Sequence, residues 1–492
     1  MQANFSYTDT VVLILYFLAT MGFGFASLKK SSTVEGFTAA KRSMPGWLTG
    51  LSILGSFVSS ISFLGYTGKA YAGNWNAYVW CFSMPVATFF AARYFVPFYR
   101  KIGSVSAYEN LEKRFGTWAR LYADICYLLT QIARIASVCY LMALPMSALF
   151  NWNIYYIVLL TSAAVILYSF VGGIVAVIWT EAMQTVVLII GAIACALILT
   201  CSVPDGFGGV CKIAGENAKF SFGSFDIFDF AQSTFFVVLI NGIFINLQNF
   251  GIDQNYVQRY ITAKSDKEAI KGLWINGLIY IPLSAVFFYI GTALFCYYTS
   301  FPSRLPAEYA ANHADYVFPY FMVSELPVGF KGLLIAAVFA AAMSTISGSL
   351  NSSATIILTD FFKRFCKKSV GQMAVLKIST IIIGALGTLI ALLLAYAKPA
   401  NALDVWWTLS GIFSGGMLGL FLMTFSPKIS PKIAIFAVAV GIISIALLTF
   451  CDGTILPVNI PMHKFTIPAV GTCVILLTGF VATAAAGKRK QL

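Results

Sequence analysis

Charge and histidine are scarce in this sequence. Charged residues make up 10% of its 492 residues, against roughly 25% in an ordinary soluble domain. Apolar residues make up 59%, and a soluble protein of this length has too little interior to hide so many side chains. The composition therefore excludes a soluble enzyme, a nucleic-acid-binding module and a secreted disulfide scaffold.

Metal-binding and catalytic motifs are also missing from the sequence. The two histidines, His313 and His463, lie in polar connecting stretches, and the ten cysteines form no CxxC pair. The chain has no HExxH motif and no carboxylate pair within an apolar run. These absences argue against a metal site, a histidine proton relay or an enzyme active site inside the membrane.

Thirteen apolar runs are long enough to cross a bilayer, which takes about 20 helical residues each. We therefore expect an all-α integral membrane protein with about 13 transmembrane helices. The first run has no basic segment before it and no cleavage site, so we expect a retained helix rather than a signal peptide. The expected spans are 9–28, 46–67, 77–99, 121–147, 153–170, 174–200, 231–252, 273–299, 326–359, 374–397, 403–424, 432–451 and 465–486.

Lysine and arginine are unevenly divided between the alternate connections. Of the 32 basic residues, 24 fall on one side and 7 on the other, and Arg134 lies inside the fourth span. The positive-inside rule predicts an N-terminus outside the cell and a C-terminus in the cytoplasm. The net charge of +13 is then a signal of topology, and no nucleic-acid partner is needed to explain it.

Cys201 and Cys211 fall in the expected outer connection after the sixth span. They form a disulfide if that compartment is oxidising, or remain two separate thiols. The sequence favours neither alternative.

Two spans carry helix-weakening residues in their interior. The second span has several Gly and Ser residues over 54–65, and the seventh has Asn and Gly over 241–249. Two interrupted spans that are five apart in order are typical of an inverted repeat, in which substrate and ions bind where these helices unwind. The alternative is that small residues only let helices approach closely. The shared five-span offset favours a binding site.

Arg134 is a buried cation, which costs at least about 2.5 kcal/mol on insertion scales. Its guanidinium suits bidentate pairing with a carboxylate. The partner is either Glu181 or backbone carbonyls within the protein, or an anionic substrate.

The ninth span carries hydroxyl side chains that do not form one polar stripe, namely Ser344, Thr345, Ser347 and Ser349. Hard cations take oxygen ligands, so such a cluster suits a weakly held Na⁺. Close helix packing is the alternative explanation. Glu181 lies at a depth from which it could supply a negative charge to this cluster.

Several motifs together resemble those of the sodium:solute symporter family, which includes sodium–glucose, proline, iodide and sialic acid transporters. They are the stretches 108–116, 172–181, 253–254, 257–260, 344–345 and 350–352. The resemblance implies a LeuT-type fold of five plus five inverted helices in one transmembrane transporter domain, 1–492. The extra N-terminal helix would be 9–28, the repeats 46–200 and 231–424, and two C-terminal helices would lie within 432–486.

The same resemblance implies two sodium sites. The main one would use the carbonyls of Gly55, Val58 and Ala341 and the hydroxyls of Ser344 and Thr345. A second one, present in some members, would use Glu181, Ser344 and Ser347. Here the chain departs from the family pattern, because Glu replaces Asp and Gly348 offers no hydroxyl.

Among the branches of the family, the chain looks most like the bacterial sialic acid transporters. That likeness implies a substrate pocket formed by Ser59, Ser60, Ser62, Arg134 and Asn246. Ala77 and Cys81 stand where that branch carries an aromatic residue and a glutamine, so the pocket lacks a stacking wall and an amide.

The resemblance thus implies a sodium symporter that imports sialic acid or a related acidic sugar with one or two Na⁺ by alternating access. The alternatives are a symporter for a neutral sugar, a polyol or another monocarboxylate, coupling to protons, and a membrane solute sensor. No ring of like charges or repeated filter sequence indicates a channel. We expect a monomer in a bacterial inner membrane, with the lipid bilayer and a small solute as its partners and no obligate protein partner.

Overall fold

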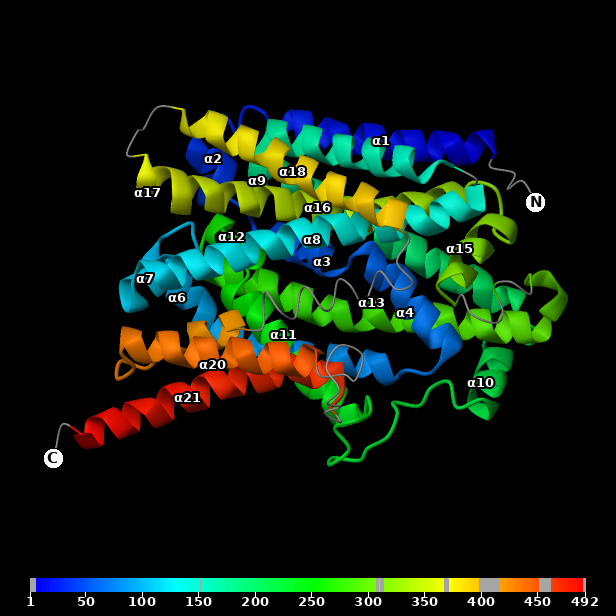
Figure 1. Cartoon of the computed structure of the whole chain (residues 1–492). Coiled ribbons are helices and arrows are strands. Elements are labelled where there is room, and N and C mark those ends of the chain that lie inside the picture. The colour runs from blue at the N-terminus through cyan, green and yellow to red at the C-terminus, as the bar shows by residue number, and fades with distance from the viewer. Residues whose placement is uncertain are drawn as a thin grey trace.

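The long helices of this chain run side by side between two ends of an elongated bundle (Figure 1). The computed structural model describes residues 6–150, 152–306, 309, 314–366, 371–397, 416–450 and 462–489. One end of the bundle carries the N-terminus, α10 (Gly206–Glu216) and α15 (Ala314–Ser324). The other end carries the C-terminus, α2 (Val34–Ala39), α7 (Glu109–Phe115) and α17 (Lys363–Phe365).

Ten helices in the described part of the chain are long and apolar enough to cross a membrane, and a broken pair would make an eleventh. The all-α membrane prediction is therefore confirmed, whereas the number of thirteen spans stays a prediction, because 403–415 lies outside the described residues. The unbroken helices are α1 (Tyr7–Ala26), α8 (Thr117–Phe150), α11 (Phe235–Ile252), α13 (Asp266–Ser300), α16 (Phe330–Ile356), α18 (Gln372–Ala397), α20 (Pro431–Phe450) and α21 (Ile467–Arg489). The third span, Asn76–Ile102, is assembled from η2 (Asn76–Ser83), α5 (Met84–Phe90), η3 (Ala91–Phe95) and α6 (Val96–Ile102).

Helix α9 (Ile154–Ser202) contains two expected spans in one continuous stretch of 49 residues. A straight helix of that length would be about 74 Å long, far more than the roughly 30 Å of a bilayer core. The backbone leaves helical geometry at Gly173, with φ 52° and ψ −152°. A Cβ on Gly173 would lie 2.6 Å from the ring of Phe37, so only glycine fits there. This residue separates the spans expected at 153–170 and 174–200.

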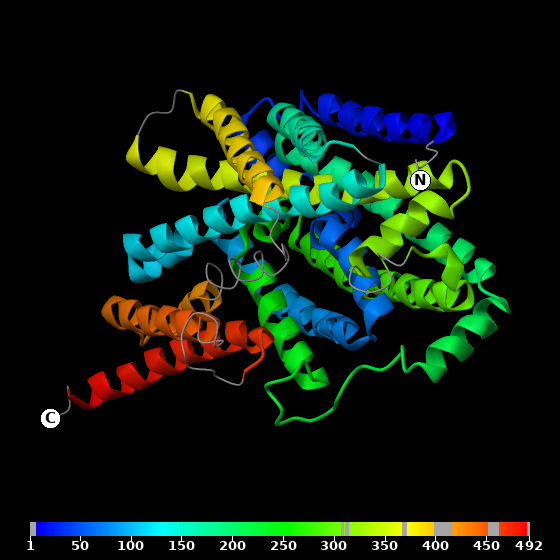
Figure 2. The same ribbon diagram turned by 45° about the vertical axis from the view of Figure 1, so that its right-hand side comes forward.

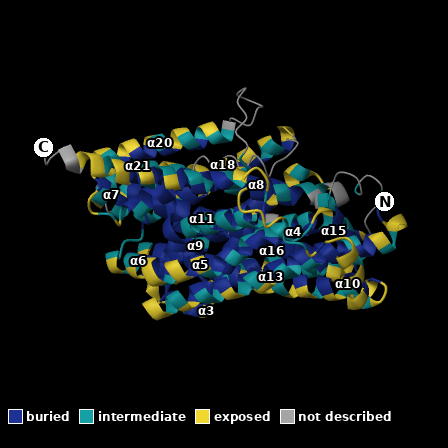
Figure 3. Cartoon of the chain, turned by 90° about the horizontal axis from the view of Figure 1, so that it is seen from below, coloured by how far each residue is buried: buried dark blue, intermediate teal, exposed yellow. Residues whose placement is uncertain are grey.

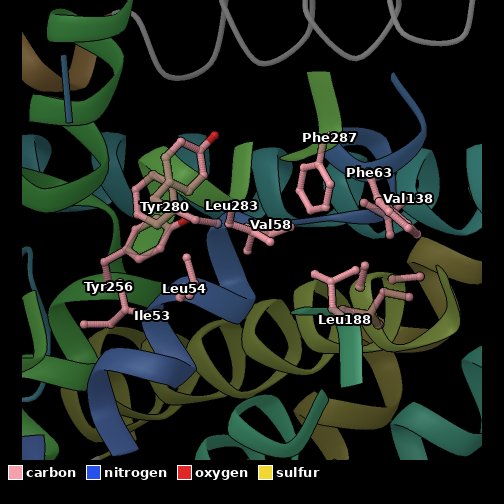
Figure 4. Close-up of a cluster of buried hydrophobic side chains, with 14 of the residues drawn as sticks. Ile53, Leu54, Val58, Phe63, Val138, Leu188, Tyr256, Tyr280, Leu283 and Phe287 are labelled. Carbon is pink, nitrogen blue, oxygen red and sulfur yellow. The ribbon is translucent and has the colours of Figure 1, made fainter. Parts of the chain in front are cut away.

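The second span is broken in its middle, as the sequence predicts. Helix α3 (Gly46–Phe57) and α4 (Ser60–Ala72) meet at Val58 and Ser59 with a bend of 54°. The Ser59 side chain caps α4 by accepting the backbone N–H of Ser62. Leu54 and Val58 lie at the break among aromatic and aliphatic side chains from other helices (Figure 4). The break is thus held in a packed core.

The interruption expected at 241–249 is wrong. Helix α11 runs unbroken through Asn241 and Gly242 and ends at Ile252. Gly242 serves close packing, because a Cβ there would lie 2.6 Å from the Ser83 hydroxyl oxygen. The chain breaks later, at Asp253, before α12 (Gln254–Thr262).

Helix α16 forms the centre of the bundle. Every residue of α16 from Leu334 to Ile356 is buried, and the helix contacts α9, α8, α18 and α1. Figure 3 shows the buried residues running through the middle of the molecule and exposed residues at its margins. The C-terminal helices α20 and α21 lie side by side on one flank (Figures 1 and 2). Large apolar side chains such as Leu389 and Leu393 on α18 are exposed, as a lipid-facing surface requires.

Candidate functional site

A cavity of about 350 Å³ opens beside the break between α3 and α4. The other walls come from α8, α11, α12, α13, α16, α20, η2, η6 (Lys464–Thr466) and the start of α21. Its polar side chains are Ser56, Ser59, Ser62, Tyr66, Lys69, Trp80, Tyr127, Thr130, Arg134, Asn241, Gln248, Asn249, Asp253, Tyr256, Tyr280, Thr345, Thr449 and Lys464. A cavity with many neutral donors and a few charges suits a small, hydroxyl-rich organic solute.

Four of the seven predicted substrate residues line this cavity, namely Ser59, Ser62, Ala77 and Arg134. Ser60, Cys81 and Asn246 are buried next to it and do not line it. Asn246 donates its amide hydrogen to the Ser83 hydroxyl over 2.8 Å. The structure therefore brings the first four together and places the other three in the surrounding packing.

Arg134 lies beside the carboxylate of Asp253 in the cavity wall, with 3.7 Å between Nη2 and Oδ2. The alternative pairing of Arg134 with Glu181 is wrong, because Glu181 contacts another arginine. Asp253 is fixed at the junction of α11 and α12, where its Oδ1 accepts the backbone N–H of Asn255 over 2.8 Å. A carboxylate and a guanidinium thus face each other in a space that a solute can enter.

Glu181 pairs with Arg259 in a sealed part of the bundle. The Nη2 of Arg259 donates to both carboxylate oxygens, over 2.5 and 2.6 Å, and neither side chain is exposed. Ser52 and Ser56 donate further hydrogen bonds to the same carboxylate. A Cβ on Gly348 would lie 3.1 Å from both Glu181 Oε1 and Arg259 Nη2, so the glycine gives this pair room.

The oxygens predicted for the main sodium site lie where α3 contacts α16. The Ser344 hydroxyl donates to the carbonyl of Gly55 over 2.8 Å and to that of Ala341 over 3.1 Å. Thr345 donates to the Ala341 carbonyl over 3.2 Å and also lines the cavity. Val58 follows the last residue of α3 and stands three residues after Gly55 in the chain. These groups are hard oxygen donors, and they connect the broken helix to the central one.

The residues predicted for a second sodium site are close to one another, but they already form hydrogen bonds or ion pairs with other groups. Ser347 donates its hydroxyl hydrogen to the carbonyl of Ser344 over 3.0 Å. Glu181 carries the guanidinium of Arg259 described above. A cation at this position would have to compete with that positive charge.

A third group of ion pairs lies at the C-terminal end of the bundle. Glu112 on α7 accepts hydrogen bonds from Arg364 and from Arg120, the second over 2.7 Å. The bond from Arg364, with that from Arg120 and both positive charges, lowers the pKa of Glu112 to about 2. Arg120 also donates to Asp360 over 2.7 Å. The cluster ties α7 and the start of α8 to α17 and to η5 (Ile357–Phe362), which follows α16.

The stretch 241–249, expected at the binding site because it would unwind, contributes one face of an intact helix to the cavity. Asn241, Ile245, Gln248 and Asn249 all line the cavity and recur at the spacing of one helix face. Asp253 was recognised only as part of a family motif, because an acid at a helix junction is usually a cap. Lys69 and Lys464 are almost 400 residues apart, and no local signal joins them.

Cys201 and Cys211 are both exposed thiols in this structure. Cys201 lies at the end of α9, and Cys211 lies on α10. The structure therefore corresponds to the thiol alternative.

Residues 37–481 match the model of the sodium:solute symporter family. The chain is 31% identical over 497 aligned positions to the sodium/sialic acid symporter SiaT of Proteus mirabilis (strain HI4320), with 99% of this chain and 97% of that protein covered. A solved Na⁺-coupled sialic acid symporter in a substrate-bound, outward-open state superposes with a TM-score of 0.90 at 29% identity, over 98% of both chains. Mhp1, a nucleobase-cation-symport-1 family transporter, shares the fold at a TM-score of 0.58 and 14% identity, over 92% of this chain and 95% of that one.

These similarities confirm the prediction of a LeuT-type transporter that couples a small solute to sodium. The repeat boundaries at 46–200 and 231–424 stay predictions. The match spans most of the chain and includes every motif on which the resemblance was based. The protein is a member of the sodium:solute symporter family.

Proposed function

We propose that this chain imports sialic acid or a closely related acidic sugar together with Na⁺. The observation that carries the proposal is Arg134, a guanidinium that faces a cavity lined by hydroxyl and amide side chains. A sugar acid presents one carboxylate and many hydroxyls, which match one guanidinium and several neutral donors and acceptors. The relatives named above support the same substrate class.

Within this pocket, Ser59 and Ser62 are the proposed hydroxyl donors to the carboxylate, with Arg134 supplying the positive charge. Ser59 and Ser62 stand at the start of α4, where the first backbone N–H groups of the helix favour an anion. Ala77 lies on the wall and offers no aromatic face, so this pocket holds the sugar ring by polar contacts and by Trp80 and Tyr280.

The proposed Na⁺ site uses the carbonyls of Gly55, Val58 and Ala341 and the hydroxyls of Ser344 and Thr345. Binding there joins the end of α3 to α16 and fixes the broken helix in the shape that presents Ser59 to the substrate. This connection is the physical basis of coupling, because the ion stabilises the substrate-binding shape. We expect Ser344→Ala to raise the Na⁺ concentration for half-maximal uptake about tenfold, a loss of about 1.4 kcal/mol. Ser349, which donates to Gln131 instead, supplies the control Ser349→Ala.

A second Na⁺ at Glu181, Ser344 and Ser347 requires Arg259 to leave Glu181. We therefore propose that one Na⁺ is transported with each substrate molecule. One Na⁺ and one monoanion carry no net charge, so a tenfold Na⁺ gradient supports about tenfold accumulation whatever the membrane potential. A second Na⁺ moves a net charge worth about 2.3 kcal/mol per 100 mV. Uptake that accelerates at an imposed negative interior potential would show the second ion.

For the membrane arrangement, we propose a monomer in a bacterial inner membrane with the N-terminus outside and the C-terminus in the cytoplasm. The excess of basic residues at the C-terminal end supports this orientation. It places the end of the bundle with α10 and α15 outside.

The test is uptake of labelled N-acetylneuraminate into proteoliposomes, with and without an inward Na⁺ gradient. We expect Na⁺-driven uptake that Ser59→Ala and Ser62→Ala reduce. Ser60→Ala is the matched control, because Ser60 lies between them in the chain but outside the cavity lining. Equal loss in all three variants would contradict the proposed pocket.

The alternative substrates remain open to the same assay. Transport of a neutral sugar or polyol, or of another monocarboxylate, with no N-acetylneuraminate uptake would move the assignment to that class. Ala77 and Cys81 would then be the first positions to examine. Binding of N-acetylneuraminate without uptake would indicate a solute sensor.

A further inference from the structure

A second cavity, of about 590 Å³, lies directly against the first. Four residues line both cavities, namely Lys69, Ala77, Lys464 and Phe465. The remaining lining comes from the end of α4, the start of η2, the segment before α11 and the segment before α21. All of these segments lie toward the end of the bundle proposed to face outside. We call this second cavity the vestibule, because a solute that passes through it reaches Arg134.

Among the described lining residues of the vestibule, the charged side chains have one sign. Lys69 and Lys464 line it, and its described lining residues include no Asp or Glu. The Nζ of Lys69 lies 5.8 Å from the centre of the Phe465 ring, which brings it next to the segment that carries Lys464. His463 also lines the vestibule, and its backbone N–H donates to the Phe230 carbonyl over 2.7 Å.

The positive charges of Lys69 and Lys464 both act on His463. Burial lowers the pKa of His463, and the positive charges of Lys69 and Lys464 lower it further. The acid of the inner cavity, Asp253, does not line the vestibule and lies beside Arg134. The path therefore carries positive charge at its entrance and a positive and a negative charge at its base.

We propose that the vestibule is an anion-collecting site, in which Lys69 and Lys464 hold the carboxylate of an acidic solute before it moves on to Arg134. Charges of one sign in a cleft with low-dielectric walls raise the local concentration of the opposite ion. An ammonium on a flexible stem attracts a carboxylate as a point charge and releases it easily, whereas a guanidinium fixes its orientation. Entrance lysines and an inner arginine thus suit capture followed by recognition.

This inference rests on the proposed function and sharpens it. A neutral sugar or polyol gains nothing from two ammonium groups at the entrance. The vestibule therefore favours an acidic sugar or another monocarboxylate over the neutral alternatives. It also assigns Lys69 and Lys464, which line both cavities, a role in the rate of capture that the residues lining only the inner cavity do not share.

The first test measures the charge of the vestibule without any transport. Ser233 lines it, and Ser233→Cys introduces a thiol whose rate of modification is compared for an anionic sulfonate and a cationic ammonium thiosulfonate reagent. At low ionic strength, Lys69→Gln or Lys464→Gln should each lower the anionic-to-cationic rate ratio on the order of fivefold. The native thiol of Cys211 on α10 is the internal reference, and its ratio should not change.

Lys212→Gln is the matched control variant, because Lys212 is exposed on α10 and lines neither cavity. A ratio at the introduced thiol that is the same in Lys69→Gln, Lys464→Gln and Lys212→Gln would overturn the proposal. This outcome does not depend on which solute is transported, so it separates the vestibule from the proposed function.

The second test is N-acetylneuraminate uptake by the same lysine variants. We expect the KM to rise severalfold while the maximal rate is kept, and the difference to shrink above about 0.1 M salt, where the Debye length falls below about 10 Å. Uptake with an unchanged KM in the lysine variants would overturn the anion-collecting role of the vestibule. It would not contradict the symporter assignment. Sodium-driven uptake of neutral sugars alone by the wild-type protein would overturn both the substrate and the anion-collecting role.

Discussion

Arg134 and Arg259 both lie within the membrane-spanning bundle, and each faces one carboxylate. The Arg259–Glu181 pair is fully buried, with contacts of 2.5 and 2.6 Å and added hydrogen bonds from serines. The Arg134–Asp253 pair is 3.7 Å apart, with 15% and 8% of the side chains exposed to the cavity. The same two functional groups therefore form a closed structural contact in one place and an open one in the other.

This difference shows how surroundings decide what an intramembrane charge does. A sealed pair has no room for a ligand, and removing one partner strands the other charge. A looser pair that lines a cavity can exchange one partner for a ligand. We therefore assign Arg259 to the fold and Arg134 to the substrate, and the predictions below test that division.

The largest effect should follow removal of the sealed carboxylate. Glu181→Ala leaves Arg259 buried without its counter-charge, which should cost about 3–5 kcal/mol of stability. The midpoint of thermal unfolding in detergent should fall sharply. The double variant Glu181→Met with Arg259→Met is the control and should regain much of the loss, because buried pairs can often be replaced by apolar residues of similar volume. An unchanged thermal midpoint in Glu181→Ala would contradict the assignment of the Arg259–Glu181 pair to the fold.

Substitution in the open pair should affect transport rather than folding. Arg134→Gln should lower kcat/KM for N-acetylneuraminate about a hundredfold, since losing one partner of a desolvated charge pair costs about 2–5 kcal/mol. The thermal midpoint should change far less than in Glu181→Ala. Arg134→Lys should recover only part of the activity, because an ammonium cannot form the planar bidentate contact. A loss of stability comparable to that of Glu181→Ala would show that the two arginines do not differ in role.

A smaller effect of opposite sign should come from Asp253. Asp253 competes with an anionic substrate for Arg134, so Asp253→Asn should tighten binding about fivefold, equivalent to about 1 kcal/mol. Asparagine caps a helix as well as aspartate does, so α12 should keep its start. Equilibrium binding measured by intrinsic tryptophan fluorescence, to which Trp80 in the cavity wall contributes, provides the readout. Weaker binding in Asp253→Asn would mean that Asp253 contacts the substrate or orients Arg134 instead.

The sequence predicted the helical membrane fold and the break in the second span from local rules that the structure obeys. Gly and Ser in an apolar helix weaken it, and the break occurs among them, at Val58 and Ser59. The same rule failed for α11, because Gly242 there allows close packing on Ser83. Whether a small residue unwinds a helix or admits a neighbour depends on the neighbour, and a single sequence does not contain that information.

The pocket was predicted in part for a similar reason. Ser59 and Ser62 are three residues apart at the start of α4 and share one face, whereas Ser60 points elsewhere. Helix geometry alone distinguishes Ser60 from Ser59 and Ser62. A resemblance that assigns the whole stretch to the pocket does not make this distinction. The pairing of Arg259 with Glu181, and of Arg134 with Asp253, depends on contacts between distant helices and could not be read from spacing.

The smallest effect concerns Glu112, whose pairs with Arg364 and Arg120 lie at the water-exposed end of the bundle. Because the pKa of Glu112 in the folded protein is lowered to about 2, its ion pairs stabilise the fold above the pKa of an unfolded glutamate, and this contribution is lost as the pH falls toward 2. Glu112 is partly exposed, so we expect only about 1 kcal/mol. Thermal midpoints measured between pH 6 and pH 3 should fall less steeply in Glu112→Gln than in the wild type. Equal slopes would show that this third arginine cluster, unlike the sealed pair, adds nothing to stability.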